Sequence, residues 1–220
     1  MGSRGQKVEK ALPGGGGDGD LGGGWSNGLG FKNYDTLKDA IGKKGRPMGM
    51  ANAVLNANPH WDPNYTYKEF TENCQRCVVA YELRRRGYDV TAQPTYQGDL
   101  LPTGVVRRDG LRNGRWMGAF RGAKPDKIRS TPSALMAKMK EYGNGSRAVL
   151  QVVWKGGRSG HVINVEYRNG RILLFDPQIG KRYNASEFMA AVKPDKTQLI
   201  RVDNLKISDR AKKSVTKDRW

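Results

Sequence analysis

The sequence is poor in the residue types that build metal sites, disulfide frameworks and membrane spans. Its 220 residues include two cysteines and two histidines, and no apolar run approaches the roughly 20 residues of a membrane-spanning helix. A four-ligand zinc site would need all four of these side chains. His60, however, lies in a loop rich in Pro, Asn and Trp, and His161 is a candidate catalytic base, as argued below. The first residues also lack the apolar core of a secretory signal peptide. The sequence therefore predicts no metal, no cofactor and no membrane span, and an exported form would need another route or a larger parent polypeptide.

Acidic residues are scarce as well. The chain has 39 Lys and Arg against 21 Asp and Glu, which gives a formal net charge of +18. Such a charge favours an anionic partner, either nucleic acid, a membrane surface or an acidic protein, without choosing among them. Because the basic residues are spread along the chain, a solvated basic surface is the simplest interpretation.

Composition divides the chain into three parts. Residues 1–30 contain two glycine runs and too little apolar surface to order themselves, so they are predicted to form a flexible arm. Residues 31–207 carry the alternating helix and strand patterns of one domain. Residues 208–220 are basic and are predicted to fray.

Within the domain the decisive element is a helix that contains both cysteines. Asn73 is suited to cap its start, and Gly87 is suited to end it after three arginines. Ser133 is predicted to cap a further helix that runs to Tyr142, and Ser186 is predicted to cap a short helix. A short strand is predicted over residues 88–92, and longer strands over residues 148–154, 161–167, 171–176 and 198–202. This mixture predicts an α+β fold.

The dipeptide Asn169-Gly170 sets the register of two of these strands. Between two apolar strands it is the strongest short signal for a two-residue hairpin turn. Counting back from that turn places Ile163 opposite Asp176. His161 and Asp176 then share one face as diagonal neighbours, roughly 7–8 Å apart at the backbone. A carboxylate in that position accepts the imidazole N–H, orients the ring and stabilises the imidazolium.

A cysteine, a histidine and an aspartate follow one another along the chain in the order found in papain-like enzymes. Cys74 is expected at the first position of the helix, beside unpaired amides that favour a thiolate and stabilise an oxyanion. Cys74, His161 and Asp176 are therefore the predicted nucleophile, base and orienting carboxylate. Cys77, one turn further on, is the alternative nucleophile, although its position in the apolar stripe favours a core role. The pair does not predict a redox disulfide, because the βαβ pattern of a thioredoxin is absent.

Two polar residues are candidates for contacts to the substrate amide or its oxyanion. Gln178 follows the aspartate, and Asn73 precedes the first cysteine. Either residue also has a simpler role, Gln178 in a turn and Asn73 as a helix cap.

Three segments resemble the papain-like fold toxin domains found in bacterial polymorphic toxins and in some phage head-morphogenesis proteins. The longest is Asn73–Val90, which contains both cysteines. Gly160–Val165 and Phe175–Gln178 look like the His and Asp motifs of that family. The resemblance covers roughly residues 60–205 and implies a helix bearing the cysteine, packed on an antiparallel sheet that carries the histidine and the aspartate.

The resemblance also implies a bacterial toxin or effector enzyme that hydrolyses an amide through Cys74, His161 and Asp176. Protein-glutamine deamidation is the expected reaction, with papain-like proteolysis as the alternative within the same chemistry. No upstream glutamine stands at the spacing of a papain oxyanion residue, so that donor stays unassigned. From another class, the chain would be a basic nucleic-acid-binding or phage structural protein without catalysis.

Partners and location follow from the same resemblance. The expected partners are a target protein with a reactive glutamine or peptide amide and a cognate immunity protein. The positive charge adds an anionic partner, either nucleic acid or an acidic protein. Delivery into the cytoplasm of a target cell is expected, as part of a larger toxin or a phage-associated protein.

Overall fold

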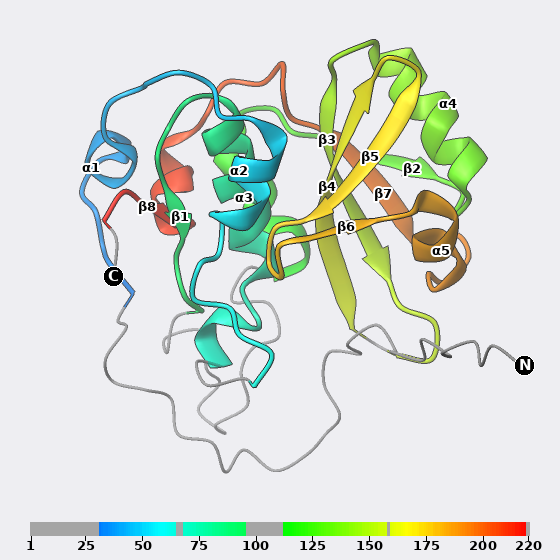
Figure 1. Cartoon of the computed structure of the whole chain (residues 1–220), viewed down its shortest axis with the longest axis horizontal. Helices are drawn as coiled ribbons and strands as arrows, with labels where there is room; N and C mark the ends of the chain where they lie inside the picture. Colours follow the sequence, from blue (N-terminus) through cyan, green and yellow to red (C-terminus); the bar gives the residue numbers. More distant parts are fainter. Residues whose placement is uncertain (1–30, 65–67, 96–111, 158, 219–220) are drawn as a thin grey trace, which may run out of the picture.

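An antiparallel sheet is the centre of the fold in the computed structural model, which describes residues 31–64, 68–95, 112–157 and 159–218 (Figure 1). Within this part of the chain the sheet has six strands in the order β2-β7-β3-β4-β5-β6. Their bounds are β2 Asp126–Ile128, β3 Arg147–Val153, β4 Gly160–Arg168, β5 Arg171–Asp176, β6 Lys181–Tyr183 and β7 Thr197–Arg201. The predicted arm, residues 1–30, lies outside the described residues.

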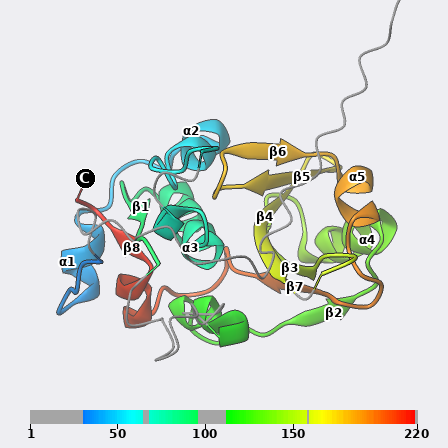
Figure 2. The same ribbon diagram turned by 90° about the horizontal axis from the view of Figure 1, so that it is seen from below.

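Helices cover both faces of this sheet. The helix α3 (Cys74–Arg85) packs on one face with Val149, Val162 and Ile200. The helices α4 (Pro132–Tyr142) and α5 (Ala185–Ala190) pack on the opposite face, where Leu150, Ile163 and other apolar strand residues form a second core (Figure 2). Consecutive residues of the central strands, Val149 and Leu150 in β3 and Val162 and Ile163 in β4, enter the two different cores, because both faces of these strands are buried.

Smaller elements surround the far side of α3. They are α1 (Leu37–Ile41), α2 (Met50–Leu55), β1 (Thr91–Ala92), β8 (Val215–Thr216) and the 3₁₀ helices Lys68–Phe70, Arg112–Ala119 and Asp209–Lys213. β1 and β8 pair with each other as a separate antiparallel ribbon. Among the described residues, no helix has the length and apolar character needed to cross a membrane.

The hairpin between β4 and β5 has the predicted register. Asn169 and Gly170 both have positive φ, 49° and 77°, as a type I′ turn requires. Pairing runs from Arg168 opposite Arg171 to Asn164 opposite Phe175. The next pair in this register is Ile163 opposite Asp176, as the count from the turn predicted.

The end of α3 depends on a glycine in close contact with another part of the chain. Gly87 has φ +99°, and a Cβ built there would lie 2.3 Å from the carbonyl oxygen of Gly45. The carbonyl of Gly87 in turn accepts a hydrogen bond from the Gly45 amide at 2.7 Å. The contact therefore ties the segment before α2 to the end of α3.

We expect Gly87→Ala to destabilise the protein by roughly 3 kcal/mol or more, because it combines an unfavourable φ with a backbone clash. Gly170→Ala is the matched control, since Gly170 also has a positive φ but open space around it. The control is expected to cost about 1 kcal/mol. Urea unfolding measures both, and equal costs would contradict the close packing at Gly87.

Several predicted helix caps are wrong. Asn73 occupies the N-cap position of α3, but its side chain makes no capping hydrogen bond. The helix α4 is capped by Thr131 rather than Ser133, and α5 by Asn184 rather than Ser186. In both cases a capping residue lay two positions earlier, so the helix begins sooner than the sequence pattern indicated.

The C-terminal segment does not fray as predicted. Its 3₁₀ helix, Asp209–Lys213, buries Ala211, and β8 buries Val215 against the core of α3. Tyr34 donates a hydrogen bond to Asp218 at 2.9 Å, which fastens the start of the described chain to its end. The apolar residues Ala211 and Val215, which stand among the basic residues of this segment, account for the difference because they are buried in the core.

Candidate active site

The fold brings Cys74, His161 and Asp176 together. Cys74 is the first residue of α3, His161 is the second residue of β4, and Asp176 is the last residue of β5. Because β4 and β5 are antiparallel neighbours, the first residues of β4 and the last residues of β5 lie at the same end of the sheet. The N-terminus of α3 faces this end of the sheet, so Cys74 lies close enough to His161 to raise the pKa of the imidazole.

The imidazole is held by a short hydrogen bond. Nε2 of His161 lies 2.7 Å from Oδ2 of Asp176, and the two side chains are only 13% and 3% exposed. Since Nε2 faces the carboxylate, Nδ1 is the ring atom left for Cys74. The indole of Trp154 stacks on the imidazole with 5.7 Å between ring centroids and limits rotation of the ring.

This environment changes the proton affinity of His161. Burial alone would lower its pKa, but the charge and the hydrogen bond of Asp176 raise it, and a hydrogen bond to Cys74 adds to the effect. The net result is a pKa well above the ordinary value of 6.5. The raised pKa favours the imidazolium form of His161, and a positive ring beside a thiol is an arrangement that favours a thiolate.

The second cysteine lies in a different environment. Cys77 is fully buried, and its thiol donates to Oδ1 of Asn73 at 3.2 Å. Burial raises the pKa of the Cys77 thiol well above its ordinary value, and the nearby Cys74 and Asp176 add to this increase. Cys74 is partly exposed, and both cysteines are free. The geometry thus favours Cys74 over Cys77 as the reactive thiol.

The side chain of Asn73 is fully used inside the protein. It is 1% exposed, and its Nδ2 donates to Oδ1 of Asn58 and to the carbonyl of Gln93, both at 3.1 Å. An amide nitrogen has two hydrogens, so none remains for a substrate.

Gln178 also has partners within the protein. Its Nε2 donates to the carbonyl of Thr71 at 2.7 Å, and its backbone N–H donates to Oδ1 of Asp176 at 3.0 Å. The residue therefore fixes the second carboxylate oxygen of Asp176 and ties β5 to the segment before Cys74. These contacts favour a positioning role over a direct contact with substrate.

Three further residues were not selected as site residues from the sequence. Asn58 joins the separate segments of the site, because its Nδ2 lies 2.8 Å from the carbonyl of Phe70 and 2.9 Å from that of Gln178. Trp154 stacks on His161, and Tyr183 lies close enough to Asp176 that burial and this charge raise its pKa. The only feature of the sequence that could have indicated Asn58 is its place in a loop rich in Pro and Trp. No feature of the sequence indicated Tyr183.

The described residues contain no cluster of three or more His, Cys, Asp or Glu side chains arranged to hold a metal ion.

The two histidines provide a test of the electrostatics. We expect His161 to titrate well above pH 6.5 and His60, whose pKa burial lowers, to titrate below it. In Asp176→Asn the pKa of His161 is expected to fall by roughly 1–3 units, because burial is then less opposed, while His60 stays unchanged. NMR titration of the ring carbons measures both, and a wild-type His161 titrating at or below 6.5 would contradict the ion pair.

The same shift predicts a pH dependence of stability. The folded pKa of His161 lies above its unfolded value, so the folded state binds the proton more tightly. The His161–Asp176 pair therefore stabilises the fold fully below the unfolded pKa, and this contribution is lost as the pH rises through the folded pKa.

The fold and site together have the arrangement of a papain-like protein, with a thiol at a helix N-terminus facing a histidine and a carboxylate on an antiparallel sheet. A family model described as "Papain fold toxin 1, glutamine deamidase" matches residues 72–181, half of the 220-residue chain. The chain belongs to this family, which supports a toxin with deamidase-type activity. No curated protein matches the chain.

Proposed function

We propose that this protein is a toxin enzyme that deamidates glutamine side chains of a target protein, with Cys74 as nucleophile. The supporting observation is the close arrangement of Cys74, His161 and Asp176, with His161 linked to both other side chains. The family description supports glutamine as the substrate residue.

The first half of the reaction forms a thioester. The Cys74 thiolate attacks the carboxamide carbon of the substrate. The backbone N–H of Cys74, at the start of α3 and without a partner among the described residues, stabilises the resulting oxyanion. His161 then gives its proton to the nitrogen of the tetrahedral intermediate. The C–N bond breaks, ammonia leaves, and the acyl group stays on sulfur.

The second half releases the product. Neutral His161 accepts a proton from water, which attacks the thioester carbon. The C–S bond breaks, the substrate leaves as glutamate, and the thiolate and imidazolium are restored. Asp176 keeps the ring oriented in both halves, because Nε2 of His161 faces it at 2.7 Å.

A delivered toxin also implies a place of action and a protective partner. We propose that the enzyme acts inside a target cell, and that a cognate immunity protein protects the producing cell. Both proposals are supported only by the family's description as a toxin.

The reaction type is tested with synthetic peptides that each contain a single glutamine, matched to peptides with asparagine at that position. The expected result is release of ammonia and conversion of glutamine to glutamate, measured by mass spectrometry, with little change in the asparagine peptides. Cleavage of the peptide backbone instead would replace the deamidase proposal with a protease. Equal conversion by wild type and Cys74→Ala would remove the proposed nucleophile.

A further inference from the structure

A cavity of about 550 Å³ lies at the end of α3 opposite to Cys74. Eleven rises along the helix separate Cys74 from Arg85, which places the cavity about 17 Å from the thiol. Its walls come from the segment of α1 and the loop after it, from the end of α3, and from residues 203–207 after β7, joined by Arg147 of β3. Much of it therefore lies outside residues 72–181, which match the family model.

The cavity is strongly basic. Five cationic side chains and one carboxylate line it, namely Lys44, Arg85, Arg86, Arg147, Lys206 and Asp203. Two carboxylates that do not line the cavity pair with its arginines: Glu166 with Arg85, and Glu82 with both Arg86 and Arg147. Arg201, also outside the lining, pairs with Asp203. Six cations thus face three carboxylates, and the site keeps a positive charge after its internal pairs are counted.

The arginines have already used most of their donors. Arg85 binds both oxygens of Glu166, and Arg147 binds both oxygens of Glu82. Arg86 donates to Glu82 and to two backbone carbonyls. The Nε and Nη2 groups of Arg85 and Arg147 are therefore engaged by these two carboxylates, which leaves at most the other N–H groups of each guanidinium for an external anion.

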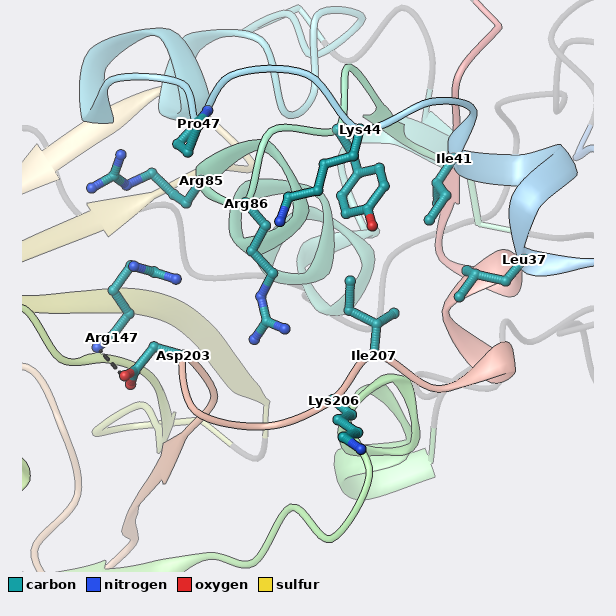
Figure 3. Close-up of a pocket in the computed structure, with 11 residues that line it drawn as sticks. Leu37, Ile41, Lys44, Pro47, Arg85, Arg86, Arg147, Asp203, Lys206 and Ile207 are labelled. Carbon is teal, nitrogen blue, oxygen red and sulfur yellow. Dashed lines mark hydrogen bonds between the residues drawn. The ribbon is translucent and has the colours of Figure 1, made fainter.

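Two lysines supply the unpaired charge. Lys44 and Lys206 are exposed, and within the described residues neither forms an ion pair. Figure 3 shows them on opposite rims of the cavity, with the arginines at one end, Leu37 and Ile41 at the other, and Ile207 between the two ends. The lining thus combines separated positive charges with an apolar surface.

We propose that this cavity binds an acidic segment of a partner protein, in which carboxylates alternate with apolar side chains. A compact phosphate requires several donors that converge on one point, and the arginine forks here already hold Glu82 and Glu166. Carboxylates spaced along a peptide match the separated lysines, and apolar side chains match Leu37, Ile41 and Ile207. A partner seated here leaves Cys74 accessible, so the proposal does not depend on the reaction that Cys74 performs.

The test uses the full chain and a fluorescein-labelled peptide of alternating Glu and Leu residues, with binding followed by fluorescence anisotropy. Lys44→Glu/Lys206→Glu reverses the two rim charges. Lys140→Glu/Lys196→Glu is the matched control, with the same change in net charge at exposed positions on α4 and before β7. Thermal unfolding verifies that both double variants are folded.

We expect the peptide to bind wild type, about tenfold more weakly to the rim variant and nearly unchanged to the control. An all-Glu peptide should bind more weakly, and saturating peptide should leave iodoacetamide labelling of Cys74 unchanged. Equal weakening in both double variants would mean diffuse charge attraction and overturn the proposal. Competition by inorganic tripolyphosphate or single-stranded RNA at lower concentrations than the peptide would also overturn it, as would protection of Cys74 by the peptide.

Discussion

Cys74→Ala is expected to lower kcat for glutamine deamidation by roughly 10⁴–10⁶-fold, the range seen when a catalytic nucleophile is removed from a hydrolase. The reason is that the proposed reaction passes through a thioester on Cys74, which is partly exposed and interacts with His161 closely enough to raise the pKa of its ring. Without the thiol, His161 and Asp176 have no acyl acceptor to activate. Ammonia release from a glutamine peptide measures the loss.

Cys77→Ala is the matched control, because it also removes one thiol from the same helix. Its sulfur is buried and bonded to Asn73, so the variant is expected to keep most of the activity and to lose about 1 kcal/mol of stability. If Cys77→Ala loses the activity and Cys74→Ala keeps it, the nucleophile moves one turn along α3.

Glu82→Gln is expected to destabilise the fold by roughly 3–5 kcal/mol, the cost of breaking a buried ion pair by removing one partner. The Glu82 carboxylate is fully buried and accepts from Arg86 at 2.7 Å and from Arg147 at 2.8 and 2.9 Å. Burial alone would lower the pKa of Arg147, but the hydrogen bonds and charge of Glu82 reverse this and raise it. The neutral amide leaves two largely buried guanidinium groups without their counter-charge.

Glu141→Gln provides the comparison for that measurement. Glu141 also pairs with a cation, Lys138 at 2.8 Å, but its side chain is 66% exposed. Removing an exposed pair costs less than about 1 kcal/mol. Urea unfolding of both variants near neutral pH gives the two free energies, and a Glu82→Gln variant as stable as Glu141→Gln would show that the buried network adds no stability.

The part of the site that the sequence could predict depends on local rules. Asn169-Gly170 strongly favours a two-residue hairpin turn, and that turn fixes the register of β4 and β5. The register places Asp176 beside His161. The helix of Cys74 was visible from its apolar stripe and from Gly87. Each of these inferences requires only residues close together in the sequence.

What the sequence did not reveal depends on contacts between distant segments. The side chain of Asn73 turns away from the helix amides because Asn58 and the carbonyl of Gln93 bind it, and no local pattern contains that competition. The strands β6 and β8 have three and two residues, too short for alternation to be recognised. The basic cavity could not be predicted either, because its cationic residues come from segments far apart in the sequence. They lie in the loop after α1, at the end of α3, in β3 and in the segment after β7.

The most direct test of the central claim, an activated Cys74 thiolate paired with His161, is intact-protein mass spectrometry after limiting iodoacetamide near neutral pH. Wild type is compared with Cys74→Ala, Cys77→Ala and His161→Ala. The account predicts one fast adduct that is absent in Cys74→Ala, retained in Cys77→Ala and slower to form in His161→Ala. Slow labelling of all four proteins, or an adduct lost only in Cys77→Ala, would contradict it.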